Sequence, residues 1–227
     1  MPYLIYGGII MSFFRLGLVG LFLTLNGCPS PDNSKVGKVV DSTIEDSSGV
    51  DSATDTDEES LEEESPITWT ECSGKPGEKA CDFTFIDQNG NPWSLYDHYG
   101  KVIVLDFSAM WCGPCNSLAG DVQSHQDHYT SQGHDVLFVT VLVDSKTWGT
   151  PPTADDIADW VNDYGMTTSP VLAADRSIID TTAEDGYPIT SWPTIVVIDK
   201  TLTIHNGVRG WSESMVYEWI DEILGLN

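Results

Sequence analysis

Basic residues are scarce in this sequence. Its 227 residues include 10 Lys and Arg against 35 Asp and Glu, so the formal net charge is −25. Because a charge of this sign repels the phosphate backbone of nucleic acids, DNA- and RNA-binding functions are excluded. The length allows one domain of about 150 residues with a surplus, or two small domains, and the surplus needs an explanation.

The sequence also lacks an apolar run of the roughly 20 residues that a membrane-spanning helix needs. Its most apolar stretch, 16–25, follows Arg15 and runs into Leu25-Asn26-Gly27-Cys28. A basic residue, a short apolar run and a small residue before a cleavage point are typical of a secretory signal. The last four residues resemble a bacterial lipoprotein cleavage box, which implies a lipoprotein signal peptide at 1–27 and lipidation of Cys28. The alternatives are a plain membrane anchor with an incidental cysteine and a translation start at Met11.

Residues 28–66 differ in composition from the rest of the chain. Positions 29–66 hold 12 acidic residues, 8 serines and 2 lysines. Such a segment buries too little apolar surface to offset the conformational entropy of folding, so we expect a disordered, acidic, Ser-rich tether. Asp51, Asp55 and Asp57 invite a calcium interpretation, but they lack the ligand spacing and the turn glycine of a calcium loop. One folded domain should therefore span residues 67–227.

Within this domain, apolar runs alternate with segments of helical periodicity. Continuous apolar runs such as 101–108 predict strands that are buried on both faces. Strands are expected at 83–87, 93–95, 101–108, 135–144, 171–173, 194–198 and 201–205, the first two and the last two forming hairpins. Helices are expected from Cys112 to about 131, from a Thr153 cap to 164, and from a Ser212 cap to 224. This order predicts the α/β class, with a central mixed sheet flanked by helices.

The candidate chemistry lies where the 101–108 strand meets its helix, at Trp111-Cys112-Gly113-Pro114-Cys115. Two thiols three residues apart at a helix start can close a small disulfide ring. The unpaired N–H groups at that helix end favour a negative charge, which lowers the pKa of Cys112 and makes it the expected thiolate. Cys115 is then placed to resolve a mixed disulfide. Zinc is the alternative for any such pair, but zinc usually takes four ligands and the sequence has no second Cys-x-x-Cys or paired His-Cys motif.

The ten residues from Asp106 to Cys115 resemble the active-site segment of thioredoxin. The lipoprotein-like start, the hairpin before the core and the inserted helix at 153–164 resemble the membrane-anchored TlpA-like branch of that superfamily. Ser191-Trp192-Pro193-Thr194, before an apolar strand, resembles the family's cis-proline loop. The resemblance implies a thioredoxin-like fold, a cis bond before Pro193, and a Trp192 backbone that pairs with an extended substrate segment.

The resemblance also implies a role for Asp106, six residues before Cys112. Thioredoxins keep a buried carboxylate there, which accepts and returns the proton of the second cysteine; burial would raise its pKa. An ordinary polar residue near a strand edge is the alternative. Two positions depart from the family pattern: Ser108 replaces the usual tryptophan, and Trp192 is bulky for the residue before the proline.

The remaining cysteines and the histidines have simpler interpretations. Cys72 and Cys81 flank a Gly- and Pro-containing segment, and in an exported protein they are expected to form a structural disulfide, the alternative being a second redox relay. His125 and His128 lie three apart on a predicted helix among polar neighbours, which favours a polar helix face over a metal site. Copper-delivery proteins of similar fold use a Cys-x-x-x-Cys pair with a distant histidine, so that alternative fits poorly.

These observations together predict an exported, membrane-tethered thiol-disulfide oxidoreductase of the cell envelope. It should need no cofactor beyond the Cys112–Cys115 dithiol and should reduce disulfides of exported proteins, cytochrome c precursors being one possibility and general disulfide repair another. The resemblance implies recharging by a membrane electron donor of the DsbD or CcdA kind. A disulfide oxidase or isomerase on the same fold, and a metal-binding module that does not turn over, remain alternatives. A peroxidase is disfavoured because no Thr-x-x-Cys loop is found near Cys112.

Overall fold

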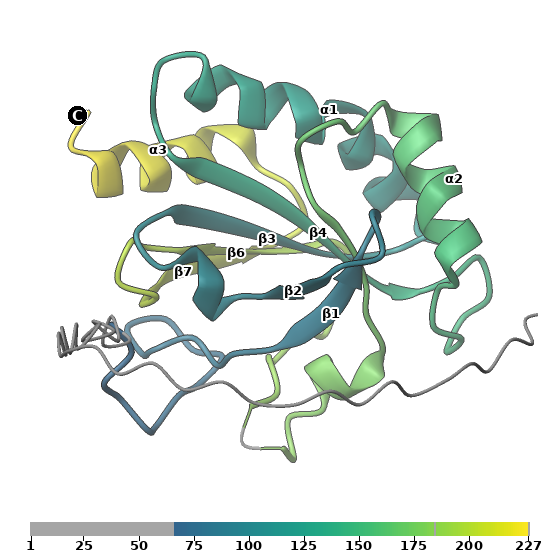
Figure 1. The fold of residues 1–227 in the computed structure, drawn as a ribbon, viewed down its shortest axis with the longest axis horizontal. Helices are drawn as coiled ribbons and strands as arrows, with labels where there is room; N and C mark the ends of the chain where they lie inside the picture. The colour runs from purple at the N-terminus through teal and green to yellow at the C-terminus, as the bar shows by residue number, and fades with distance from the viewer. Residues whose placement is uncertain (1–65, 184, 227) are drawn as a thin grey trace, which may run out of the picture. The chain divides into compact units, whose positions relative to one another are not determined.

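The computed structural model describes residues 66–183 and 185–226, which belong to a compact unit, 60–227 (Figure 1). Its centre is a seven-stranded sheet in the order β2-β1-β5-β4-β3-β6-β7. The strands are β1 (Thr84–Asp87), β2 (Pro92–Ser94), β3 (Val102–Ala109), β4 (Val136–Asp144), β5 (Val171–Ala173), β6 (Thr194–Ile198) and β7 (Ile204–Arg209). The helices are α1 (Gly113–Thr130), α2 (Ala154–Tyr164) and α3 (Glu213–Leu224), with short 3₁₀ turns η1 (Tyr96–His98) and η2 (Arg176–Ile179).

The sheet is mixed, as the sequence predicts. Strands β3, β4 and β5 run parallel, while β6 is antiparallel to β3, and β1 is antiparallel to β5. All eight residues of β3 are buried, which explains why this strand reads as a continuous apolar run. No helix within residues 66–183 and 185–226 is both long and apolar enough to cross a membrane.

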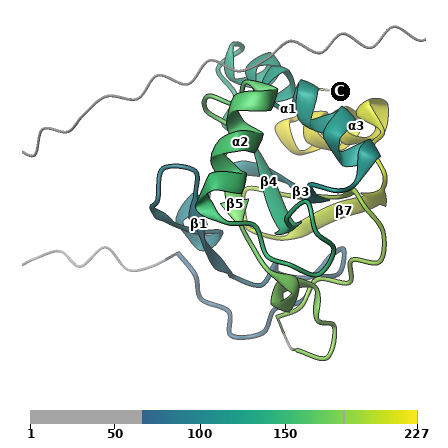
Figure 2. The same cartoon turned by 90° about the vertical axis from the view of Figure 1, so that its right-hand side faces the viewer.

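Two hydrophobic clusters lie on opposite faces of the sheet. On one face, Val102 and Val104 of β3 pack with side chains of all three helices. On the other face, Ile103 and Leu105 pack with the segment before β1 and with the chain between β5 and β6. Figures 1 and 2 show this arrangement: the three helices lie above the sheet, and the loop segments with η2 lie below it. Alternate residues of β3 therefore serve different cores.

The carboxyl ends of the parallel strands define the edge where the candidate site lies. Because β3, β4 and β5 run in the same direction, the loops that follow them emerge at one edge of the sheet. The residue that starts β6, Thr194, pairs with Phe107 near the end of β3, which brings the loop before β6 to the same edge. Three segments that are distant in the sequence thus meet beside the Cys112 turn.

One local expectation was wrong, and a second was confirmed only in position. Strand β7 begins at Ile204 and not at residue 201, because the Asp199 carboxylate accepts hydrogen bonds from the N–H groups of Thr201 and Thr203 (2.8 and 2.9 Å) and holds a turn there. Leu202, inside that turn, has a φ of 59°, which a strand does not allow. Ser212 is the N-cap residue of α3 but makes no side-chain cap bond, whereas Thr153 forms a full capping box with Asp156.

Candidate active site

Cys112 and Cys115 are joined in a disulfide at the start of α1, with their Cα atoms 5.3 Å apart. Cys112 is the N-cap residue of the helix, and its Sγ accepts a hydrogen bond from the N–H of Cys115 at 3.2 Å. Pro114 occupies the first turn, where its missing N–H has no helical partner to lose. The first turn carries no acidic residue, so nothing there offsets the positive end of the helix dipole. A thiolate on Cys112 would therefore be stabilised.

The two sulfur-bearing residues differ in accessibility. Cys112 is 5% exposed and Cys115 is fully buried. Gly113 leaves open space beside the turn, since no atom lies within 4 Å of where a Cβ would sit. Cys112 is therefore the more accessible of the two cysteines.

Asp106 lies on β3, buried on the helix side of the sheet. Residues 102, 104, 106 and 108 of a strand share a face, and Val102 and Val104 belong to the same cluster as Cys115. One carboxylate oxygen, Oδ1, accepts a 2.7 Å hydrogen bond from the Ser108 hydroxyl, and Oδ2 has no hydrogen-bond partner among the described residues. Burial raises the pKa of Asp106 to about 7, and the hydrogen bond from Ser108 opposes that rise.

Ser108 also belongs to this site, although the sequence did not predict a role for it beside Asp106. Its hydroxyl is fully buried and faces Asp106, two positions away on the same strand. The alternation of side chains along a strand was the signal that could have identified it, because positions 106 and 108 must share a face.

The peptide bond between Trp192 and Pro193 is cis. The Pro193 carbonyl accepts a 2.7 Å hydrogen bond from the N–H of Gly210, and the Thr194 hydroxyl donates to the Ser191 carbonyl at 2.8 Å. The first bond ties the loop to the residue that follows β7, and the second closes the loop on itself. Trp192 is half-buried and packs against both hydrophobic clusters, so its bulk is accommodated inside the fold.

Trp111, beside Cys112, is held by residues that the sequence did not single out. Its indole N–H donates to Oδ2 of Asp144, the last residue of β4, at 2.9 Å. Asp144 is fully buried and also accepts two hydrogen bonds from the Arg176 guanidinium, at 2.9 Å and 2.6 Å.

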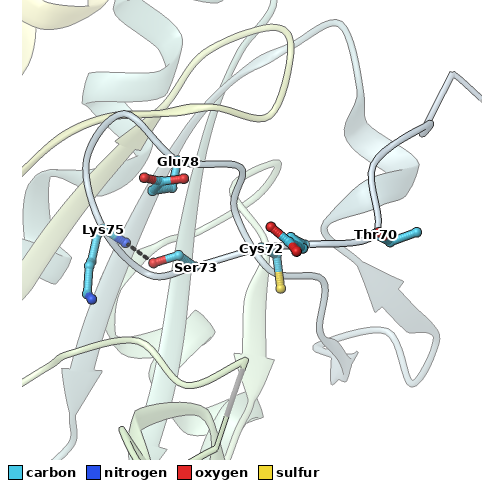
Figure 3. Close-up of a pocket in the computed structure, with 6 residues that line it drawn as sticks. Thr70, Cys72, Ser73, Lys75 and Glu78 are labelled. Carbon is cyan, nitrogen blue, oxygen red and sulfur yellow. Dashed lines mark hydrogen bonds between the residues drawn. The ribbon is translucent and has the colours of Figure 1, made fainter.

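Cys72 and Cys81 form the second disulfide of the described chain, with Cα atoms 4.8 Å apart. Cys81 is fully buried, and its carbonyl accepts a 2.9 Å hydrogen bond from the buried Tyr187 hydroxyl. Cys72 borders a surface hollow of about 670 Å³ (Figure 3). The hollow is lined by Thr70, Glu71, Cys72, Ser73, Lys75 and Glu78. None of these belongs to the Cys112 turn or to the proline loop. Cys28, the predicted signal peptide at 1–27 and nearly all of the predicted tether at 28–66 lie outside the described residues.

His125 corrects the expectation of a polar helix face. It is buried, its Nδ1 lies 2.9 Å from the Tyr217 hydroxyl, and its ring packs against Trp211 with centroids 4.6 Å apart. The reason is that α3 covers this side of α1, and burial lowers the pKa of His125. Among the residues described, no group of three or more His, Cys, Asp or Glu side chains is placed to hold a metal ion.

Comparison with solved structures identifies the fold. A Chlorobium tepidum protein provisionally described as the thiol:disulfide interchange protein DsbE superposes with a TM-score of 0.53 at 25% identity, covering 66% of this chain and 99% of that one. A DsbF homologue from Corynebacterium diphtheriae gives a TM-score of 0.51 at 21% identity, covering 63% of this chain and 85% of that one. The seven-stranded mixed sheet with its three helices is thus a thioredoxin-like fold.

Comparison of sequences points to the same chemistry. The chain is 28% identical over 148 residues to the thiol-disulfide oxidoreductase ResA of Bacillus subtilis, covering 65% of this chain and 75% of that protein. It is 25% identical over 152 residues to ResA of Halalkalibacterium halodurans, covering 66% and 77%. The model of the AhpC/TSA family matches residues 76–206, more than half of the chain. With a disulfide at the first turn of its first helix, the chain belongs to the AhpC/TSA family and is a thioredoxin-like thiol-disulfide oxidoreductase.

Proposed function

We propose that this oxidoreductase reduces disulfides of exported proteins, with Cys112 as the attacking residue, Cys115 as the resolving residue and Asp106 as the proton acceptor. One observation carries the proposal: a disulfide at a helix start, more exposed at Cys112, lies on the same side of the sheet as a buried carboxyl whose pKa is raised to about 7. A group with that pKa can both accept and return a proton near neutral pH.

The first half of the cycle starts from the dithiol form. The Cys112 thiolate attacks one sulfur of the substrate disulfide, so that an S–S bond forms between enzyme and substrate while the substrate's own S–S bond breaks. The other substrate sulfur leaves as a thiolate and takes a proton from water. Trp111, Gly113 and Pro114 shape the turn, and the backbone of Trp192 beside Pro193 offers an edge for an extended substrate segment.

The second half releases the product. Cys115 gives its proton to Asp106 and attacks Sγ of Cys112, which closes the Cys112–Cys115 disulfide and expels the second substrate sulfur. Asp106 then returns the proton to that sulfur. The substrate has gained two electrons and two protons, and the enzyme is left in the oxidised form.

Three further features of the proposal concern direction, location and the second disulfide. A Gly-Pro centre resembles that of thioredoxin, at about −270 mV, and not that of strong oxidants near −120 mV, which favours reduction.

The signal at 1–27 and Cys28 support export and lipid anchoring to a bacterial membrane, facing the periplasm or the exterior, so a membrane electron donor of the DsbD or CcdA kind would restore the dithiol. Cytochrome c precursors are one candidate substrate class. Cys72–Cys81 would fasten the segment before β1.

The decisive experiment is a trap. A Cys115→Ser variant cannot resolve the mixed disulfide, so envelope proteins should accumulate on Cys112 and be released by dithiothreitol. The matched Cys112→Ser variant should capture none. Capture by Cys112→Ser alone would reverse the two roles. Titration in glutathione buffers separates directions: a reductase stays oxidised until the buffer is strongly reducing, whereas an oxidase or isomerase is reduced in a mildly reducing one.

A further inference from the structure

A buried ion pair supports the rim of the active site. The Asp144 side chain is completely buried, whereas the side chain of its partner Arg176 is 35% exposed. Nε and Nη2 of Arg176 bind the two carboxylate oxygens in the bidentate fork that is typical of strong Arg–Asp pairs. Oδ2 accepts from both Nη2 of Arg176 and the Trp111 indole. Burial alone would raise the pKa of Asp144, but these hydrogen bonds and one from the Gly149 backbone hold it below its ordinary value.

The same arginine also contacts a second tryptophan, Trp148. The Arg176 guanidinium carbon lies 4.4 Å from the centroid of the Trp148 ring, within the range of a cation–π contact. Trp148 is 69% exposed, the largest exposed fraction among the large hydrophobic side chains of the described chain. Its loop is closed by a hydrogen bond from the N–H of Ser145 to the carbonyl of Thr150 at 2.7 Å, so the indole stands on an ordered turn.

The two indoles belong to the active-site edge of the sheet. Trp111 follows β3, Trp148 follows β4, and Arg176 follows β5, and these three parallel strands end at the same edge. Trp111 itself is 39% exposed beside Cys112. Because the charge of Arg176 is matched by that of Asp144, the ion pair that supports the two rings carries no net charge, and the exposed surface of the rings themselves is aromatic. Such a surface favours apolar side chains over charged ones.

We propose that Arg176 is a positioning residue that holds Trp111 through Asp144 and Trp148 through its own guanidinium plane, and that the two indoles select substrate segments with an apolar side chain next to the reactive cysteine. The inference rests on the proposed function, since it takes Cys112 as the attacking residue. It makes Trp148 a specificity-determining residue of the site.

The test uses three short disulfide peptides that are identical except for the residue next to each cysteine, which is Leu, Lys or Asp. With the full chain and dithiothreitol as the electron source, kcat/KM for the Leu peptide should exceed the other two values about fivefold, the effect expected of one aromatic contact. Trp148→Ala should abolish this preference, mainly through KM. Tyr99→Ala is the matched control, since Tyr99 is exposed near the opposite end of β3 and the variant should keep the preference.

The positioning role of Arg176 is tested with separate variants. Arg176→Gln should reduce the Leu preference and shift the ¹⁵N–¹H resonance of the Trp111 indole, assigned with Trp111→Phe, while Arg176→Lys, which keeps the charge, should recover part of both. An unchanged resonance in a folded Arg176→Gln overturns the positioning role; if that variant does not fold, Trp148→Ala decides. Equal kcat/KM for all three peptides, or a preference for Lys or Asp, overturns the inference and leaves the proposed function standing. Failure to reduce any of the three peptides would contradict the proposed function itself.

Discussion

Two buried aspartates on neighbouring strands have pKa values displaced in opposite directions. Asp106 on β3 receives one hydrogen bond from a neutral hydroxyl, so burial dominates and raises its pKa to about 7. Asp144 on β4 receives a guanidinium fork and an indole N–H, which overcome burial and lower its pKa. The first can exchange protons near neutral pH, whereas the second stays ionised and serves as an anchor. Both side chains are buried, so their different hydrogen-bond partners, and not the extent of burial, determine the two roles.

Replacing the proton acceptor should slow resolution of the mixed disulfide. Asp106→Asn keeps the shape of the side chain but cannot take the Cys115 proton, so we expect resolution about 100-fold slower at pH 7, the lower range for general acid–base catalysis. In the wild type the rate should rise with pH through an inflection near 7, where Asp106 becomes a carboxylate. Stopped-flow measurements between pH 5.5 and 9 would record both effects.

Ser108→Ala is the control for this prediction. It removes the hydrogen bond that stabilises the charged form of Asp106, so the pKa of Asp106 should rise further and the inflection should move to higher pH. An inflection that stays in place in Asp106→Asn would assign it to another group.

Asp106 should also make stability depend on pH. Its folded pKa of about 7 lies above the ordinary value of 3.8, so between these values the native state keeps a proton that the unfolded state releases. The free energy of unfolding should therefore fall as pH rises from about 4 to about 7, by on the order of 4 kcal/mol. Asp106→Asn should remove this component and be more stable than the wild type at pH 8. Urea unfolding of the oxidised protein at pH 5 and pH 8 gives the change in the free energy of unfolding with pH. An equal change in the wild type and in Asp106→Asn would contradict the prediction.

Contacts between distant positions explain why the Asp144–Arg176 pair and the burial of His125 were not predicted. Cys112, Cys115 and Asp106 lie in one ten-residue segment, so a local pattern was enough to propose them. Arg176 and Asp144 are 32 positions apart, and Tyr217 lies 92 positions from His125. Their pairing depends on strand order and on how α3 covers α1, which no local pattern specifies.

At the scale of elements, the helix starts offer a direct comparison of two caps. Thr153 accepts a hydrogen bond from the N–H of Asp156, whose carboxylate accepts in turn from the N–H of Thr153. Ser212 occupies the equivalent position of α3 without a side-chain bond. Thr153→Ala should therefore lower the free energy of unfolding by about 1 kcal/mol, and Ser212→Ala should change it far less. Chemical denaturation of the two variants measures the free energy of unfolding. Equal losses in both would mean that the hydrogen bonds at Thr153 do not account for its stabilisation of the helix.

Most elements could be predicted because their patterns are local. The strands β5 and β6 match their expected ranges, and α1, α2 and α3 lie within one or two residues of theirs. Strand β7 was misplaced because its start depends on the side chain of Asp199 and on the left-handed conformation of Leu202. The η2 turn was missed because four residues carry too little periodicity to predict a helix.

At the scale of the whole molecule, charge is unevenly divided. Residues 29–66 include 12 acidic residues and 2 lysines, so this part of the sequence contributes −10 of the net −25. If Cys28 is lipidated, as we propose, these 38 residues would link the lipid anchor to the catalytic domain.

This arrangement predicts that Cys28 alone fastens the protein. In bacteria fed a palmitate label, the full chain should be labelled and recovered with membranes. Cys28→Ser should lose the label and appear in the soluble envelope fraction if the signal is still cleaved, and in the membrane if it is not. The matched Cys72→Ser/Cys81→Ser double variant should keep the label, since those cysteines lie 44 and 53 positions further along. A single acyl chain binds membranes only reversibly, so firm retention of the full chain requires the several chains of a lipoprotein. Label that persists in Cys28→Ser would place the modification elsewhere, and an unlabelled, membrane-bound full chain would support the uncleaved anchor.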